Sequence, residues 1–262
     1  MKKLILSLVT MASLAFAANA VTNMCVKTTD GNVVEFDVEN VAEVYYKEVA
    51  ETIGDQGVTV SGKVGLYTYV DLGLPSGTKW ATYNVGATKP TEYGDDFAWG
   101  ETKPKVYYGW ETYKWCNGSE HSMTKYCTQS KYGTVDSKRV LETEDDAATA
   151  NWGSAWRMPT EEELDELVEG CDWKWVWDFN GSGVSGRLGT SKKNGATIFL
   201  PAASSRIGTA LIGAGRSGSY WSSSLREDDS RFAYCLTFNE DVNFYRSSKY
   251  RDNGPSVRAV LR

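Results

Sequence analysis

The chain has 262 residues, of which 41% are hydrophobic, 24% charged and 13% aromatic. This composition fits a folded globular protein and excludes a disordered, collagen-like or coiled-coil chain. The formal net charge is −6, and it is uneven: residues 21–200 carry 17 basic and 28 acidic side chains, whereas residues 201–262 carry 9 and 6. An acidic body without clustered lysines argues against nucleic acid as a partner.

The N-terminal segment predicts export. Two lysines open it, residues 4–16 are apolar, and Ala18-Asn19-Ala20 is a small-residue cleavage site, as in a secretion signal over residues 1–20. The apolar stretch is short for a membrane span, so none is expected. A lipid anchor through Cys25 is a weaker alternative, because Thr22-Asn23-Met24 is a poor approach to a lipidated cysteine. We expect a protein that is secreted or held at the cell surface or outer envelope.

A small β-hairpin unit is expected over residues 21–46. Asp30-Gly31 lies between two alternating segments, 24–28 and 33–38, which is a strong hairpin signal. A hairpin of this size buries little surface alone. Residues 47–64, rich in Gly, Thr and Ser, predict a linker to the rest of the chain.

The remainder, residues 65–262, predicts one α+β domain with few short helices and many short strands. Its clearest helix opens at Thr160, which can cap it while Glu163 completes a capping box, and ends at Gly170. A second short helix is expected after Thr143. Short alternating or apolar runs predict strands over residues 66–71, 79–85, 96–100, 196–200, 219–223, 232–238 and 257–261.

Groupings typical of catalytic sites are scarce in the sequence. A nucleophilic triad needs a base, and the single histidine, His121, lies in a Gly-Ser-Glu-His-Ser stretch typical of an exposed loop. One histidine also argues against a Cys/His zinc site. Adjacent carboxylates suit caps, turns or calcium ligands better than an acid–base dyad, and the pairs are Asp95-Asp96, Asp145-Asp146 and Asp228-Asp229. We expect no enzymatic activity, and a structural calcium ion is the one cofactor left open.

The five cysteines lie at positions 25, 116, 127, 171 and 235. Export permits disulfides, but an odd number leaves at least one thiol free or paired outside the chain. Cys116 and Cys127 flank a loop that contains Gly and Ser, and they are the expected disulfide, although Cys171 could replace either.

The ten tryptophans are expected mainly in the core. Five of them occupy strand-like or glycine-flanked positions: Trp80, Trp99, Trp152, Trp156 and Trp221. Three others, Trp173, Trp175 and Trp177, alternate with different residue types, which predicts an edge strand that presents a face of rings.

Several strings of the chain resemble one family, and they recur in order. They are residues 70–81 (VDLGLPSGTKWA), 93–95 (YGD), 97–101 (FAWGE), 145–148 (DDAA), 151–153 (NWG), 156–160 (WRMPT), 199–203 (FLPAA), 220–224 (YWSSS) and 256–258 (SVR). They resemble the Fibrobacter succinogenes major paralogous domain, common among exported proteins of Bacteroidetes. The resemblance covers roughly residues 65–262. It implies a C-type-lectin-like body, similar to that of formylglycine-generating (sulfatase-modifying) enzymes.

Two departures limit what this resemblance implies. The enzyme branch binds copper through a nearby pair of C-terminal cysteines, and here that region has only Cys235. Calcium-dependent lectins grip sugars through Glu-Pro-Asn or Gln-Pro-Asp, and neither tripeptide occurs. Neither the enzyme activity nor a calcium-gripped sugar is therefore expected.

The C-terminal segment has its own composition. Lys, Glu, Gln, Met and Trp make up 34 of the 136 residues 65–200 but only 4 of the 50 residues 204–253. Codons that end in a pyrimidine cannot encode these five residue types. Related C-type-lectin-like proteins are targets of diversity-generating retroelements, which randomise adenines in a C-terminal stretch, and this tail resembles such a variable region. Ordinary surface-loop composition is the alternative.

This tail is the predicted ligand face. Its six arginines could meet acidic groups, and its Tyr residues could stack on a ligand, although alternation with Leu236 could place Tyr234 in the core. Leu211 and Ile212, between two glycines, have no obvious core partner and are the expected anchor. The candidate ligand-binding residues are Arg206, Thr209, Leu211, Ile212, Arg216, Leu225, Arg226, Asp229, Arg231, Tyr234, Asn239, Asn243, Tyr245, Arg246, Ser248, Tyr250 and Arg251.

These patterns favour an exported, non-enzymatic, adhesin-like protein that recognises a protein or glycan ligand. A structural subunit of a surface fibre, with the hairpin unit serving assembly, is the first alternative. An envelope enzyme related to formylglycine-generating enzymes is the second. The oligomeric state stays open.

Overall fold

The computed structural model describes residues 23–27, 33–37, 51–52 and 57–261. The chain divides into two compact units, Met1–Glu48 and Val49–Arg262. In the smaller unit, β1 (Asn23–Lys27) pairs antiparallel with β2 (Val33–Asp37), which confirms the predicted hairpin. Its expected Asp30-Gly31 turn lies outside the described residues, as does the predicted secretion signal.

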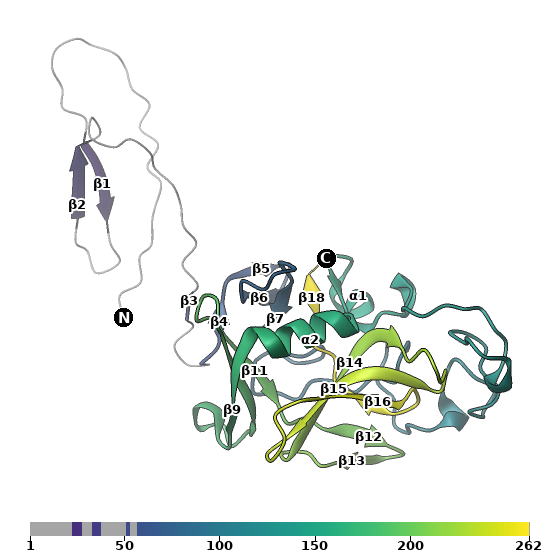
Figure 1. Ribbon diagram of the computed structural model, residues 1–262. Coiled ribbons are helices and arrows are strands. Elements are labelled where there is room, and N and C mark those ends of the chain that lie inside the picture. Colours follow the sequence, from purple (N-terminus) through teal and green to yellow (C-terminus); the bar gives the residue numbers. More distant parts are fainter. Residues whose placement is uncertain (1–22, 28–32, 38–50, 53–56, 262) are drawn as a thin grey trace, which may run out of the picture. The chain divides into compact units, whose positions relative to one another are not determined.

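The larger unit is mostly β, with several small antiparallel sheets (Figure 1); the few short helices and many short strands were expected, although an α+β domain was predicted. Its first sheet holds five strands in the order β5 (Gly62–Val64), β6 (Tyr67–Asp71), β7 (Lys79–Ala81), β18 (Val260–Leu261) and β8 (Trp156–Arg157). Strand β18, near the C-terminal end of the chain, therefore lies between β7 and β8. In this part of the chain, α1 (Ala147–Trp152) and α2 (Glu161–Gly170) are the α-helices, with short 3₁₀ turns at Trp110–Thr112, Ser130–Tyr132, Thr143–Asp145 and Phe179–Gly181.

Part of the expected linker belongs to the larger unit. Strand β4 (Thr59–Val60) pairs with β3 (Glu51–Thr52), and β5 joins the five-stranded sheet. Val58 is buried against two phenylalanines, and the Thr59 hydroxyl accepts a hydrogen bond of 2.9 Å from the backbone N–H of Thr197. A linker over 47–64 was therefore wrong for residues 58–64, because both short strands are paired and Thr59 is also held by Thr197, 138 residues away.

A three-stranded sheet has the order β11 (Thr197–Pro201), β10 (Gly186–Ser191) and β9 (Cys171–Val176). Strand β9 is an edge strand, as its alternating tryptophans predicted. Trp173 and Trp175 pack against the core, whereas Trp177 is 63% exposed. The face of rings is therefore mostly a packing face.

Two further sheets come from the C-terminal segment. One has the order β14 (Ser217–Leu225), β15 (Phe232–Asn239) and β16 (Tyr245–Tyr250), and the other has the order β13 (Ala210–Ile212), β12 (Ser205–Ile207) and β17 (Gly254–Pro255). The strand expected over 96–100 does not form. Asp96 makes only an isolated bridge to Ser256 there.

The side-chain caps of the two α-helices explain where they begin, and the capping box of α2 was predicted. The Thr160 hydroxyl accepts from the Glu163 backbone N–H, and the Glu163 carboxylate accepts from the Thr160 N–H, so α2 starts at Glu161. The Asp146 carboxylate caps α1 in the same way, by accepting from the Thr149 N–H. Leu164 and Leu167 of α2 are buried, as predicted.

The aromatic core forms as the sequence indicated. Trp80, Trp99, Trp156 and Trp221 are fully buried, and Trp152 packs partly buried against the same core. Helix α2 packs across β14 and β15 (Figure 1), where it covers Leu236 and Phe238. The next residue on the same face of β15, Tyr234, lies beside the N-terminal part of α2, and a groove opens there.

Candidate functional site

The groove is built on the paired strands β15 and β16. Tyr234 lies opposite Ser248, and Leu236 lies opposite Arg246, so these four side chains share one face of the sheet. Helix α2 covers Leu236 but not Tyr234, and the chain after β14 forms the far wall. The resulting groove has a volume of about 630 Å³ and is lined by Arg226, Glu227, Asp228, Tyr234, Arg246, Ser247 and Ser248.

Arg226 is neutralised within this groove. Its guanidinium donates to both carboxylate oxygens of Asp228, over 2.6 and 2.8 Å, and to the Ser248 hydroxyl over 3.3 Å. The hydrogen bonds from Arg226 hold the pKa of Asp228 below its usual value. Both side chains are therefore charged, and each already has its partner.

Arg246 is neutralised by the first turn of α2. Its guanidinium lies 2.8 Å from a carboxylate oxygen of Glu161 and donates a hydrogen bond to Asp165. Burial raises the pKa of Glu161, although the charge of Arg246 acts in the opposite direction. Beneath this ion pair lies a small gap of about 10 Å³, lined in part by Leu164, Cys235 and Leu236.

Tyr234 forms the floor of the groove between these two ion pairs. Its side chain is half-buried, and burial raises the pKa of its hydroxyl. Among the described residues, that hydroxyl has no hydrogen-bond partner. Alternation with Leu236 could have placed Tyr234 in the core, but Tyr234 is only half-buried, beside the N-terminal part of α2.

Aromatic rings continue the surface beside the groove. Phe232 stacks on Tyr250, with ring centroids 4.3 Å apart, and Arg226 lies over the Phe232 ring at 5.5 Å. Trp110, from a different part of the chain, meets Tyr250 edge-on at 5.8 Å. Tyr250, a predicted ligand-binding residue, is 38% exposed.

Other predicted residues lie on the β12–β13 hairpin. Leu211 and Ile212 are 36% and 52% exposed, in agreement with the expectation that they lack a core partner. Arg206 pairs with Asp96 over 2.7 Å, and Arg206 and Thr209 line a second, smaller pocket of about 400 Å³ with Lys105 and Tyr108. The groove and this pocket have no lining residue in common.

The remaining predicted residues are dispersed. Asp229 pairs with Arg231 over 2.7 Å. Asn239 shapes the turn after β15, because its side-chain oxygen accepts from the backbone N–H groups of Asp241 and Val242. Three others are exposed outside the groove: Arg216, Asn243 and Tyr245.

Two predicted ligand-binding residues are structural instead. Leu225 is 2% exposed and packs in the core beside Trp221. Arg251 is fully buried. The prediction was wrong for both residues. Their burial depends on which segments cover the end of a strand, and the types of residue in a polar stretch do not indicate which segments these are.

The α2 carboxylates were missed by reasoning from the sequence. Glu161 and Asp165 are one helical turn apart and share a face of α2, which the sequence shows. Nothing in the sequence places that face beside Arg246, which lies 81 residues from Asp165.

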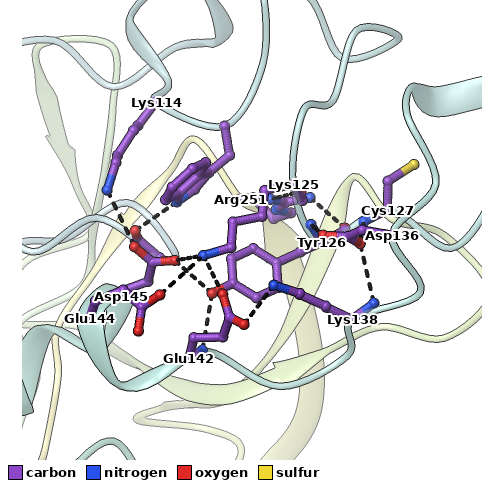
Figure 2. Close-up of polar contacts among 12 residues, drawn as sticks. Lys114, Lys125, Tyr126, Cys127, Asp136, Lys138, Glu142, Glu144, Asp145 and Arg251 are labelled. Carbon is purple, nitrogen blue, oxygen red and sulfur yellow. Dashed lines mark hydrogen bonds and ion pairs between the residues drawn. The ribbon is translucent and has the colours of Figure 1, made fainter.

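One close group of acidic side chains occurs in the part of the chain that the structure describes: Glu142, Glu144 and Asp145. The ammonium of Lys125 lies among them (Figure 2), 2.5 Å from Glu142, 2.5 Å from Asp145 and 3.8 Å from Glu144. Burial alone would lower the pKa of Lys125, but the hydrogen bonds that its ammonium donates to Asp145 and Glu142 raise it. The lysine occupies the position that a cation would need, so this group offers no calcium site.

The predicted disulfide is not formed. Cys116, Cys127, Cys171 and Cys235 are free, buried thiols. The Cys116 thiol donates to the carbonyl of Trp110 over 3.2 Å, and the Cys127 thiol donates to the carbonyl of Gln129 over 3.2 Å. Each thiol is turned toward a backbone acceptor of its own loop.

The single histidine is exposed. Among the described residues, His121 stacks on Tyr132 and pairs with Glu120 at 3.4 Å. Among the described residues, no helix is long and apolar enough to cross a membrane. Comparison of the chain with family models, with curated proteins and with solved structures finds no match.

Proposed function

We propose that the chain is an exported, non-enzymatic recognition protein that binds a protein or glycan ligand in the groove between β16, the end of β14 and α2. One observation carries this proposal. Four of the predicted ligand-binding residues, Arg226, Tyr234, Arg246 and Ser248, come from three separate stretches of sequence and line one groove. The groove is open and polar, and its central ring has a free hydroxyl.

The scaffold around the groove supports this role. Strands β15 and β16 carry the floor of the groove, the turn after β14 forms one wall, and the sheet beneath is held by buried aromatic side chains such as Trp221 and Phe238. A rigid base lets side chains on one face change without loss of the fold. We also propose, from the sequence strings that resemble that family, that the larger unit is a C-type-lectin-like domain of the Fibrobacter succinogenes major paralogous family.

The proposal of a variable C-terminal segment becomes more specific. Leu225 and Arg251 are buried and belong to the framework, so diversification would spare them. A near-copy of the 3′ end of the gene, differing mainly at adenines and lying beside a reverse transcriptase gene, would support diversification. Adenine differences that changed Arg251 as often as Arg246 would contradict it.

The recognition proposal is tested with glycan and peptide arrays. The mature chain from Val21 is compared with Tyr234→Ala, which removes the groove floor, and with Tyr107→Ala, a matched control. Tyr107 is 44% exposed and does not line the groove. We expect Tyr234→Ala to weaken binding of the captured ligand at least about tenfold, the loss typical of a central aromatic contact, and Tyr107→Ala to leave it unchanged. Equal binding by all three proteins would contradict the assignment of the groove.

A further inference from the structure

The charges of the groove favour a cationic ligand. The groove and the gap beneath Arg246 are lined by two arginines, Arg226 and Arg246, and by four carboxylates, Glu161, Asp165, Glu227 and Asp228. Their sum is −2. Arg139 pairs with Glu227 from outside the groove, over 2.5 Å, and brings the local sum to −1. An anion entering the groove therefore meets net repulsion.

The two arginines are also not available to an anion. Arg226 is held by both oxygens of Asp228, and Arg246 is held by Glu161 and Asp165. A carboxylate or sulfate would have to replace a partner that is already in place. The expectation that these arginines meet acidic ligand groups is therefore not favoured by their surroundings.

The ion pair at α2 is asymmetric in its exposure. The Arg246 side chain is 56% exposed, whereas those of Glu161 and Asp165 are 13% and 35% exposed. The arginine lies on the solvent side and can swing out, but the carboxylates are fixed to the helix. The Glu161 oxygen that lies 2.8 Å from the Arg246 guanidinium has no hydrogen-bond donor of good geometry among the described residues, so the ion pair is what holds it. Once Arg246 leaves, two carboxylates and the apolar gap beneath them face the groove.

We infer that the groove receives a lysine or arginine side chain of a polypeptide partner, whose charged end replaces Arg246 on Glu161 and Asp165. The aliphatic part of that side chain would run over Tyr234 toward Leu164 and Leu236, which line the gap. This inference rests on the proposed recognition function and specifies the chemistry of its ligand. The carboxylates belong to the body of the domain, whereas Arg246 belongs to the segment of unusual composition, so a change at Arg246 would tune access to a constant acidic site.

The experiment measures binding of short peptides to the ¹⁵N-labelled mature chain by NMR. The probes are acetylated and amidated pentapeptides of the form Gly-Ser-X-Ser-Gly, where X is Lys, Arg, Glu or Ser. We expect the Lys and Arg peptides to shift the resonances of the groove and the Glu and Ser peptides to leave them unchanged. We expect Arg246→Ala to raise the affinity for the Lys peptide at least about threefold, because an internal competitor is removed.

A matched control separates local competition from overall charge. Arg216→Ala also removes one positive charge, but Arg216 is exposed, lies outside the groove and has no acidic partner among the described residues. We expect it to change the affinity by less than twofold. In the double variant Glu161→Gln with Asp165→Asn, the Lys peptide should no longer shift the resonances of the groove. Thermal unfolding of each variant checks that it is folded.

The outcomes distinguish the two proposals. If Arg246→Ala and Arg216→Ala raise the affinity equally, the effect is long-range and the inference is wrong. If the Glu peptide binds and Arg246→Ala weakens it, the groove takes anions, which overturns the inference but leaves the recognition function standing. If no groove variant changes the binding of any peptide or array ligand, both proposals fail.

Discussion

The guanidinium of Arg251 donates a hydrogen bond of 2.9 Å to the hydroxyl of Tyr113, inside the larger unit. It also donates to the backbone carbonyls of Lys125, Tyr126 and Ser230, over 2.9 to 3.0 Å, and to the sulfur of Met123 over 3.6 Å. The ring of Trp99 lies 5.1 Å from the same guanidinium. Burial raises the pKa of Tyr113, so its hydroxyl stays protonated at neutral pH. This one side chain therefore ties together loop segments that are more than 100 residues apart.

We expect the Arg251→Ala variant to be less stable than the unsubstituted protein. The substitution leaves three buried carbonyl groups without donors and opens a cavity, so we expect a loss of more than about 3 kcal/mol in the free energy of unfolding. Urea denaturation followed by tryptophan fluorescence measures it. Arg216→Ala, at an exposed arginine of the same segment, should change that free energy by less than about 0.5 kcal/mol. Similar values for the two variants would show that Arg251 is not a structural residue.

Asp252 should make stability depend on pH. It is 5% exposed, and one of its carboxylate oxygens has no hydrogen-bond partner. Burial raises the pKa of Asp252 to about 6, although nearby Lys105 acts in the opposite direction. The folded protein therefore binds this proton more tightly than the unfolded chain does. The contribution of this proton to stability is fully present below about pH 4 and is lost as the pH rises through 6.

Asp252→Asn removes this dependence. The free energy of unfolding of the variant, relative to the unsubstituted protein, should rise between pH 4 and pH 8 by up to about 3 kcal/mol, the equivalent of the pKa difference. Urea denaturation at pH 4, 6 and 8 measures the trend. Asp241→Asn, at an exposed position, serves as the control. A difference between variant and unsubstituted protein that stays constant with pH would argue against a buried, titrating Asp252.

The capping box of α2 predicts which of three substitutions destabilises the protein most. Thr160→Ala removes one cap hydrogen bond and should cost about 1 kcal/mol. Glu163→Ala should cost more, because that carboxylate also accepts from Arg157 over 2.6 Å and from the Thr78 hydroxyl over 2.9 Å. Glu162→Ala, exposed in the same turn, should change stability by less than about 0.5 kcal/mol. Thermal or urea unfolding ranks the three, and an equal loss at Glu162 and Glu163 would contradict the cap.

Because the buried thiols are free, we expect a reductant to leave the stability of the protein unchanged. Cys116 and Cys127 each donate to a carbonyl of their own loop rather than joining each other. With Cys25 replaced by Ser, the unfolding midpoint should be the same with and without a phosphine reductant. A disulfide between these two cysteines would instead be worth about 2–4 kcal/mol, and its reduction would lower the midpoint measurably. Mass analysis of the alkylated, denatured protein counts the thiols independently.

Local elements of this protein were determined by the sequence itself. Three local features are the hairpin of β1 and β2, the capping box at the start of α2 and the cap of α1. Each depends on residues within a few positions of one another, so the sequence itself contains the groups that form its hydrogen bonds. The buried tryptophans follow from their size and apolar character. These features needed no knowledge of which segments meet.

The tertiary structure alone decided which polar residues are available to a ligand. Arg216, Arg246 and Arg251 are the same residue type in one segment, yet they are respectively exposed, paired with α2 and fully buried. The difference comes from partners that lie far away in the sequence, such as Asp165 for Arg246 and Tyr113 for Arg251. A charge is neutralised or buried by whatever packing brings against it, and that is a property of the folded chain as a whole.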